Sequence, residues 1–185
     1  MSLVELIARA DARALAVSGL GCLDRCVPLL GADPAHDEAL RPLWTCLAGD
    51  RAGWDERLVA ARAALDGGDA TGEAAQEVRR MLATAPRQTA SDGWHEWADA
   101  CSVAALQAHL TLDAAGAPVT AAAAWREGRT EGMSPLLAAE LQRQTRILRL
   151  LAESGAGGLR EALDVATEGR RVVRAVLSRR ARSGA

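Results

Sequence analysis

The hydrophobic residues of this chain recur at intervals of three and four positions, and the longest such run covers residues 91–113. Trp94, Trp97 and Cys101 lie at this spacing together with several Ala residues, so they share one face of an α-helix. The polar side chains of the segment form only a narrow stripe, made by His95, Asp99, Ser102 and His109. A helix with so little polar surface is buried between neighbouring elements. The pattern therefore predicts a buried central helix at about residues 91–113.

Further helices are predicted on both sides of this segment, because Gly, Pro and capping residues divide the remaining helical patterns. Ser2 and Glu5 form a capping box at the start of the first helix, and Ser134 before a proline marks the start of a late one. Gly19 and Gly21 are expected to separate the first helix from the second. The predicted helices cover about residues 3–17, 22–30, 41–48, 51–66, 71–85, 91–113, 119–126, 135–153 and 159–180.

The fold class that follows is all-α, because no segment alternates between apolar and polar residues over the length of a strand. We expect a bundle of about eight or nine helices around the buried central helix. A chain of 185 residues can bury one sizeable core, so residues 1–185 are expected to form a single helical domain. The glycine-rich residues 155–158 are expected to be a flexible linker before a basic C-terminal helix, and residues 181–185 a disordered tail.

Composition changes this picture in two respects. The chain has no Phe, Tyr or Lys, so its five Trp residues must supply all the large aromatic packing and its basic residues are all Arg. The net charge is −2, but residues 134–185 carry ten Arg against five acidic residues, which leaves the rest of the chain acidic. This acidic front argues against a dedicated nucleic-acid-binding protein.

The sequence also predicts where the protein resides. No run of about 18 apolar residues is present, so no membrane-spanning helix is expected. Charges at Glu5, Arg9 and Asp11 interrupt the N-terminus, which is not typical of a signal peptide. Four Cys with no C-x-x-C pair suit reduced thiols. These features predict a cytoplasmic protein without a membrane partner.

Two segments could be considered as metal sites. His95-Glu96 followed by Asp99 resembles the zinc-protease pattern H-E-x-x-H, but Asp99 stands where the second His is needed and no third ligand lies at a suitable spacing. A hydrogen bond between His95 and Asp99, one helical turn apart, is the preferred interpretation. Cys22 and Cys26 could form half of a zinc site, although packing in the core is the more ordinary role of two such thiols. The sequence thus predicts no metal and no cofactor.

Catalytic patterns are missing as well. The chain has no G-x-G-x-x-G, no phosphate-binding loop and no G-x-S-x-G, and no nucleophile is paired with a base by spacing. We therefore predict no catalytic residues and no enzymatic activity. If the central helix borders a cavity, that cavity would be lined by Trp94, His95, Asp99, Cys101 and His109.

One segment resembles a known family. The run CLDRCVPLLG at residues 22–31 is followed by an acidic loop and a helix that ends LAGD, and it combines a Cys, the pair Asp24-Arg25, and Pro28 before two Leu residues. Residues 22–50 thereby resemble the front of a family of all-helical immunity proteins from bacterial polymorphic toxin systems. The aromatic residue expected ahead of Cys22 is absent, since residues 16–20 contain none. The resemblance implies a protein that acts by binding another protein.

Two functions are consistent with these observations. The first is a non-enzymatic helical protein that binds a partner protein, with an immunity-like role implied by the resemblance. The alternative is a helical protein that binds a small molecule or a metal in the cavity beside residues 94–109. Homo-oligomer formation stays open in both.

Overall fold

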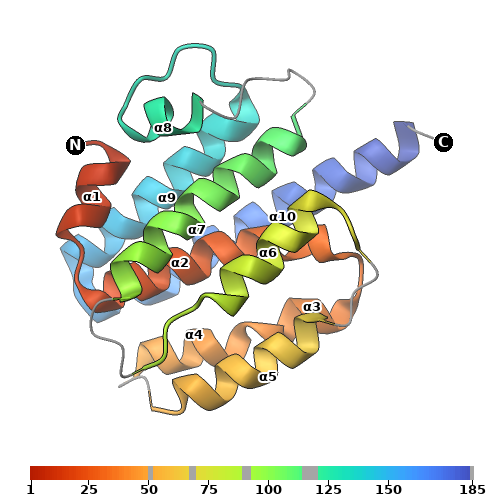
Figure 1. Ribbon diagram of the computed structural model, residues 1–185. Helices are drawn as coiled ribbons and strands as arrows, with labels where there is room; N and C mark the ends of the chain where they lie inside the picture. The colour runs from red at the N-terminus through yellow and green to blue at the C-terminus, as the bar shows by residue number, and fades with distance from the viewer. Residues whose placement is uncertain (50–51, 67–69, 89–92, 114–120, 184–185) are drawn as a thin grey trace.

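The computed structural model describes residues 1–49, 52–66, 70–88, 93–113 and 121–183, and within these residues every regular element is helical (Figure 1). The all-α fold class is therefore confirmed. The elements are α1 (Leu3–Arg9), α2 (Ala12–Cys26), η1 (Val27–Leu30), α3 (Pro34–Ala39), α4 (Arg41–Ala48), α5 (Trp54–Asp66), α6 (Glu73–Ala83), α7 (Gly93–Thr111), α8 (Ala121–Arg126), α9 (Pro135–Ser154), η2 (Gly155–Gly158) and α10 (Leu159–Ser183), where η denotes a 3-10 helix.

The centre of the bundle is a pair of helices, α2 and α7, which run side by side through the molecule (Figure 1). Both α9 and α10 pack against α2, and α6 packs against α7. Helices α3, α4 and α5 contact one another and form a separate layer in the lower part of Figure 1. The predicted buried helix is confirmed as α7 over Gly93–Thr111, while residues 91–92 of the predicted range lie outside the described residues. It shares the centre with α2, in which every residue from Ala14 to Cys26 is buried.

The start of α2 differs from the prediction. The predicted helix 3–17 is divided at Asp11, whose side chain caps α2 by accepting a hydrogen bond of 2.7 Å from the backbone N–H of Ala14. Gly19 and Gly21, expected to separate two helices, lie inside α2 instead. A Cβ atom added at Gly19 would come within 2.6 Å of the Trp97 ring, so this glycine allows α7 to approach α2 closely.

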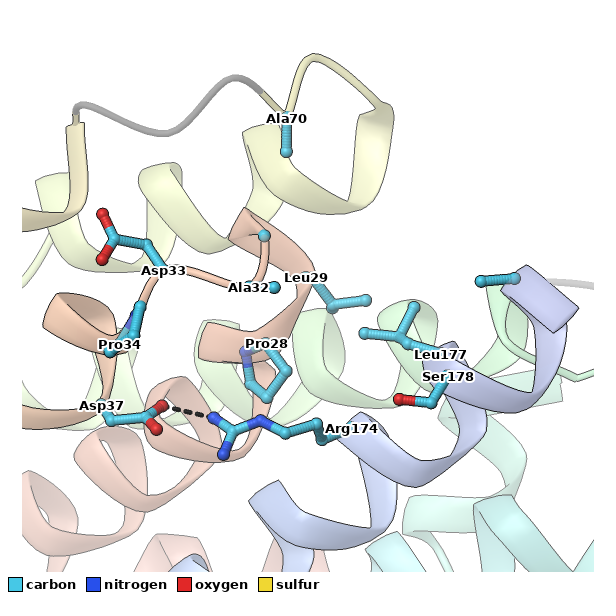
Figure 2. A pocket seen from close by; sticks show the side chains of 12 residues that line it. Pro28, Leu29, Ala32, Asp33, Pro34, Asp37, Ala70, Arg174, Leu177 and Ser178 are labelled. Carbon is cyan, nitrogen blue, oxygen red and sulfur yellow. Dashed lines mark hydrogen bonds and ion pairs between the residues drawn. The ribbon is translucent and has the colours of Figure 1, made fainter.

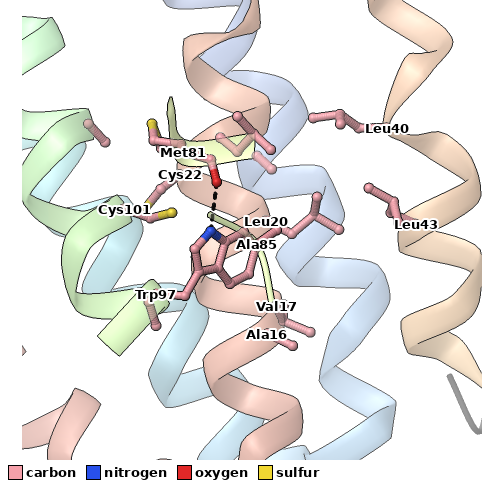
Figure 3. Close-up of a cluster of buried hydrophobic side chains, with 14 of the residues drawn as sticks. Ala16, Val17, Leu20, Cys22, Leu40, Leu43, Met81, Ala85, Trp97 and Cys101 are labelled. Atoms are coloured by element: carbon pink, nitrogen blue, oxygen red, sulfur yellow. Dashed lines mark hydrogen bonds between the residues drawn. The ribbon is translucent and has the colours of Figure 1, made fainter. Parts of the chain in front are cut away.

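A cluster of Trp residues joins α5 and α7. The ring centroids of Trp54 and Trp94 lie 5.3 Å apart, and those of Trp94 and Trp97 lie 6.0 Å apart, both pairs edge to face. Trp97 also donates a hydrogen bond of 2.8 Å from Nε1 to the carbonyl oxygen of Met81, at the end of α6 (Figure 3). The indoles therefore supply large aromatic packing, as composition predicted, and they connect three helices.

The C-terminal part of the chain is more regular than predicted. Residues 155–158, expected to be a flexible linker, form η2, and a Cβ atom at Gly158 would lie 2.6 Å from the carbonyl oxygen of Leu150. This close approach requires a glycine and sets the tight turn between α9 and α10. Residues 181–183, expected to be part of a disordered tail, continue α10, while 184–185 lie outside the described residues.

Candidate functional site

The five residues predicted to line one cavity do not share one environment. Trp94, Cys101 and His109 are buried, whereas His95 is exposed and Asp99 is half-buried. Cys101 borders a cavity of about 400 Å³ between α6 and α7, and the other four do not line it. Asp99 pairs with Arg126 of α8 rather than with His95. Among the described residues, no three His, Cys, Asp or Glu side chains come together as metal ligands.

The strongest polar feature of the core is an ion pair between α2 and α9. Arg25 donates from Nε and Nη2 to the two carboxylate oxygens of Glu140, at 2.8 and 2.7 Å, and both side chains are 0% exposed. This fork-to-fork geometry is the strongest hydrogen-bonding arrangement available to an Arg and a carboxylate. Arg25 Nη2 also lies 3.4 Å from the sulfur of Cys22, one turn earlier on α2.

Polar side chains extend this pair toward the surface. Gln144 donates from Nε2 to Glu140 at 2.9 Å, and its Oε1 accepts a hydrogen bond of 2.6 Å from the hydroxyl of Ser102. Arg126 then donates from Nε to the same hydroxyl at 3.0 Å and pairs with Asp99. A continuous polar chain thus connects α2, α9, α7 and α8 through the bundle.

His109 borders this chain from α7. Its Nδ1 lies 2.7 Å from the carbonyl oxygen of Ala105, and since a carbonyl only accepts, the Nδ1–H donates this hydrogen bond. Its Nε2 then faces Glu140 Oε2 at 3.5 Å. The imidazole is held by its own helix and lies against Glu140 of α9, so it borders the buried network.

A second buried carboxylate fastens α10. Asp24 accepts a hydrogen bond of 3.1 Å from Trp44 Nε1 and forms an ion pair of 3.0 Å with Arg170 of α10. Arg170 also donates to the backbone oxygen of Asp37 at 2.9 Å, and Arg174 pairs with the Asp37 carboxylate. Neighbouring residues of α2 therefore bind different helices: Arg25 holds α9, and Asp24 holds α10.

The pKa values of the two buried carboxylates, Glu140 and Asp24, are shifted in opposite directions. Burial raises the pKa of Glu140, but the charges of Arg25 and His109 and the hydrogen bonds from Arg25 and Gln144 lower it by more, so this pKa lies below its ordinary value. Burial raises the pKa of Asp24, and the charge of Arg170 and the hydrogen bond from Trp44 offset only part of that rise. Both groups are engaged in holding helices together.

The thiols of the core are protected by the same burial. All four Cys are free and buried, which confirms the predicted core packing of Cys22 and Cys26 and adds Cys46 to the buried thiols. Burial raises the pKa of Cys22 to about 12 and raises the pKa values of Cys26 and Cys101 well above the ordinary thiol range. Because the thiolate is the reactive form, these three thiols are poorly suited to nucleophilic chemistry.

We predict that a thiol reagent at about pH 8 labels Cys22, Cys26 and Cys101 far more slowly in the native protein than after denaturation. The reason is twofold, since the reagent cannot reach the sulfur atoms and the thiols stay protonated. Mass spectrometry of labelled peptides at successive times would give the rate for each Cys. Prompt labelling of Cys22 in the native protein would contradict this arrangement.

The surface offers a different kind of site beneath the last helix. The C-terminal half of α10 runs out beyond the body of the bundle (Figure 1), and a groove of about 590 Å³ lies between it and η1. We call this the α10 groove. Its lining residues are Pro28, Leu29, Gly31, Ala32, Asp33, Pro34, Asp37, Ala70, Arg174, Leu177, Ser178 and Ala181. Figure 2 shows Leu29 and Leu177 approaching each other across its apolar part, with the Asp37–Arg174 pair at one end.

Sequence reasoning missed both the buried ion pairs and the α10 groove. A signal for the ion pairs was present, because Asp24 and Arg25 are the only charges between Ala14 and Leu30. Two charges within so long an apolar run indicate burial with a partner. The groove had no such signal, since its walls come from residues 28–37 and 174–181, which are far apart in the chain.

Together, the fold and these features define an all-helical bundle with an ion-paired core and an open groove beneath its last helix. Comparison with family models, with curated proteins and with solved structures found no match for this chain. Within the described residues, no helix is long and apolar enough to cross a membrane.

Proposed function

We propose that this chain is a cytoplasmic helical protein that acts by binding another protein, in an immunity-like role, and that the α10 groove is its binding surface. The observation that carries this proposal is the open groove of about 590 Å³, which has an apolar floor and charged edges. Specific protein interfaces combine an apolar centre with a polar rim. The side chains of the core that could do chemistry are occupied in ion pairs or protected as buried thiols.

The segment that resembles immunity proteins supports the same surface. Its first part, including Cys22 and the Asp24-Arg25 pair, is buried and holds α9 and α10 in place. Its next part, including Pro28 and Leu29, lines the α10 groove. A single short segment therefore builds one wall of the groove and fixes the helix that forms the other wall.

The alternative function, a small molecule or metal held by Trp94, His95, Asp99, Cys101 and His109, has less support. His95 is exposed, Trp94 is packed between two other indoles, and His109 is engaged with Ala105 and faces Glu140. On a regular helix, His95 and His109 are also separated by about 21 Å. These residues would have to rearrange before they could share one ligand.

We predict that Ala181→Trp blocks partner binding without unfolding the protein. Ala181 is exposed and lines the groove, so an indole there fills the space that a partner needs, while a surface substitution changes stability by only about 0.5 kcal/mol. The matched control is Ala60→Trp, on the exposed face of α5.

The measurement is co-expression with a growth-inhibiting protein encoded beside the gene of this chain, scored by rescue of growth, and hydrogen exchange of the purified complex. Wild type and Ala60→Trp should rescue growth and show protection along η1 and the end of α10. Ala181→Trp should neither rescue growth nor show this protection from hydrogen exchange. Protection confined to another face, or equal rescue by both variants, would contradict the α10 groove as the binding surface.

A further inference from the structure

We infer that the partner segment bound in the α10 groove is a protein segment that is acidic along one edge, with its carboxylates paired to the arginines of α10. This inference rests on the proposed function, because it specifies the partner of the same groove. It is argued from the charges on the two walls and from the apolar floor between them.

The wall formed by α10 is basic. Arg174 lines the groove and is paired with Asp37, while Arg171 and Arg182 lie just outside the lining, on the side of the helix that carries Ser178, because they precede and follow it by seven and four positions. Both Arg171 and Arg182 are exposed, and neither forms an ion pair with any residue that the structure describes. Arg guanidinium groups bind carboxylates in a planar, two-pronged geometry. Arg171 and Arg182 can therefore pair with two carboxylates of a partner along this edge of the groove.

The facing wall carries the opposite charge. Asp33 is exposed at the edge of the groove, and Asp37 is already neutralised by Arg174. A segment with carboxylates on both sides would be repelled by Asp33, so the complementary segment is acidic only where it faces α10. The charge arrangement of the groove thus sets the orientation of its ligand.

The floor adds an apolar requirement. Pro28, Leu29, Leu177 and Ala181 contribute carbon surface between the two charged walls. Figure 2 shows Leu29 and Leu177 pointing into this space from η1 and α10. A segment with apolar side chains on the edge opposite its water-exposed face would fill it, as an amphipathic helix or strand does in a recognition groove.

Two other occupants fit the charges less well. A second copy of this chain, interlocked through the same groove, would bring the arginines of two α10 helices together, and like charges in contact oppose association. A nucleic acid would meet Asp33 and a chain whose net charge is −2. The experiment distinguishes a second copy and a nucleic acid from the acidic protein segment.

The probe is a fluorescein-labelled amphipathic peptide of about twelve residues with Leu on one face and Glu along one edge, compared with the same peptide carrying Gln for Glu. Binding to the full-length protein is followed by fluorescence anisotropy at low and high salt. We expect the Glu peptide to bind about tenfold more tightly than the Gln peptide at low salt, and this preference to fall as salt rises.

Three variants of the protein test whether the charges beside the groove cause this preference. Arg171→Glu/Arg182→Glu should weaken the Glu peptide by about tenfold or more and leave the Gln peptide unchanged. Asp33→Asn should strengthen the Glu peptide, since it removes a repulsive charge while Asn still caps α3. Arg146→Glu/Arg149→Glu is the matched control, because these exposed arginines lie on α9 near η2, at the opposite end of α10, and it should behave as wild type.

Several results would overturn the inference. Equal binding of both peptides, equal weakening by the α9 control, or weaker binding to Asp33→Asn would show that the α10 arginines do not select an acidic edge. Tighter binding of single-stranded oligothymidylate than of the Glu peptide would favour nucleic acid. Self-association in sedimentation that disappears in Arg171→Glu/Arg182→Glu would favour a second copy. If Ala181→Trp blocks the cellular partner while the charge variants do not, the proposed function stands and this inference fails.

Discussion

Glu140→Ala is expected to lower the free energy of unfolding by about 3–5 kcal/mol, the usual cost of removing one partner of a buried ion pair. The variant leaves the Arg25 guanidinium at 0% exposure without its carboxylate, and a guanidinium is not deprotonated in proteins, so the buried charge stays uncompensated. Gln144 also loses an acceptor at 2.9 Å. Urea denaturation followed by circular dichroism would measure the change.

The control for this prediction is the double variant Arg25→Met/Glu140→Leu. Replacing both charges by apolar side chains of similar volume is often neutral or stabilising in other proteins, so the double variant should regain most of the stability that Glu140→Ala loses. If the double variant is as unstable as the single one, the loss comes from packing and from Gln144 and His109 rather than from the orphaned charge.

The Arg25–Glu140 pair also predicts how the stability of the fold changes with pH. Because the pKa of Glu140 is lowered in the folded protein, its carboxylate stabilises the fold fully above the ordinary Glu pKa, and this contribution is lost as pH falls through the folded value. The stability difference between wild type and Glu140→Ala should therefore be larger above about pH 5 than in acid, and it should narrow as pH falls. A difference that widens toward acid would contradict the lowered pKa.

Trp97→Ala should also destabilise by about 3–5 kcal/mol, since it empties a large site in the core. Trp97 is 3% exposed, stacks edge to face on Trp94 and donates a hydrogen bond of 2.8 Å to Met81 (Figure 3). The variant removes this packing and leaves the Met81 carbonyl without its side-chain donor. Chemical denaturation would again give the value.

A substitution at Gly19 tests whether the Trp97 ring packs directly against α2 at this position. In wild type, Gly19→Ala should destabilise because its Cβ would come within 2.6 Å of the Trp97 ring. In the Trp97→Ala background the ring is gone, so the same substitution should become neutral or stabilising, as Ala favours a helix over Gly by about 1 kcal/mol. Additive effects in this double-mutant cycle would mean that the two residues are not in contact.

Local patterns in the sequence were sufficient for most of the helices and for the ends that carry capping residues, but not for the break at Asp11 or for the continuity of α2 through Gly19 and Gly21. The capping box of Ser2 and Glu5 is present with both hydrogen bonds, and Ser134 caps α9 before a proline. The apolar spacing of 91–113 gave a buried helix, α7. These features depend on residues within one or two turns of each other, which is why they can be read without the fold.

The contacts that hold helices together could be determined only by the tertiary structure. Arg25 and Glu140 are 115 positions apart, and the sequence does not state which carboxylate among many will face that guanidinium. Asp99 forms an ion pair with Arg126 and not the predicted hydrogen bond with His95. The tertiary structure brings the guanidinium of Arg126 from α8 to this carboxylate, while His95, one turn earlier on α7, is exposed. Gly19 does not end α2, and the ring of Trp97 from α7 occupies the space where its side chain would be. Periodicity places a residue on a face of its own helix, but which helix meets that face depends on how all of them pack at once.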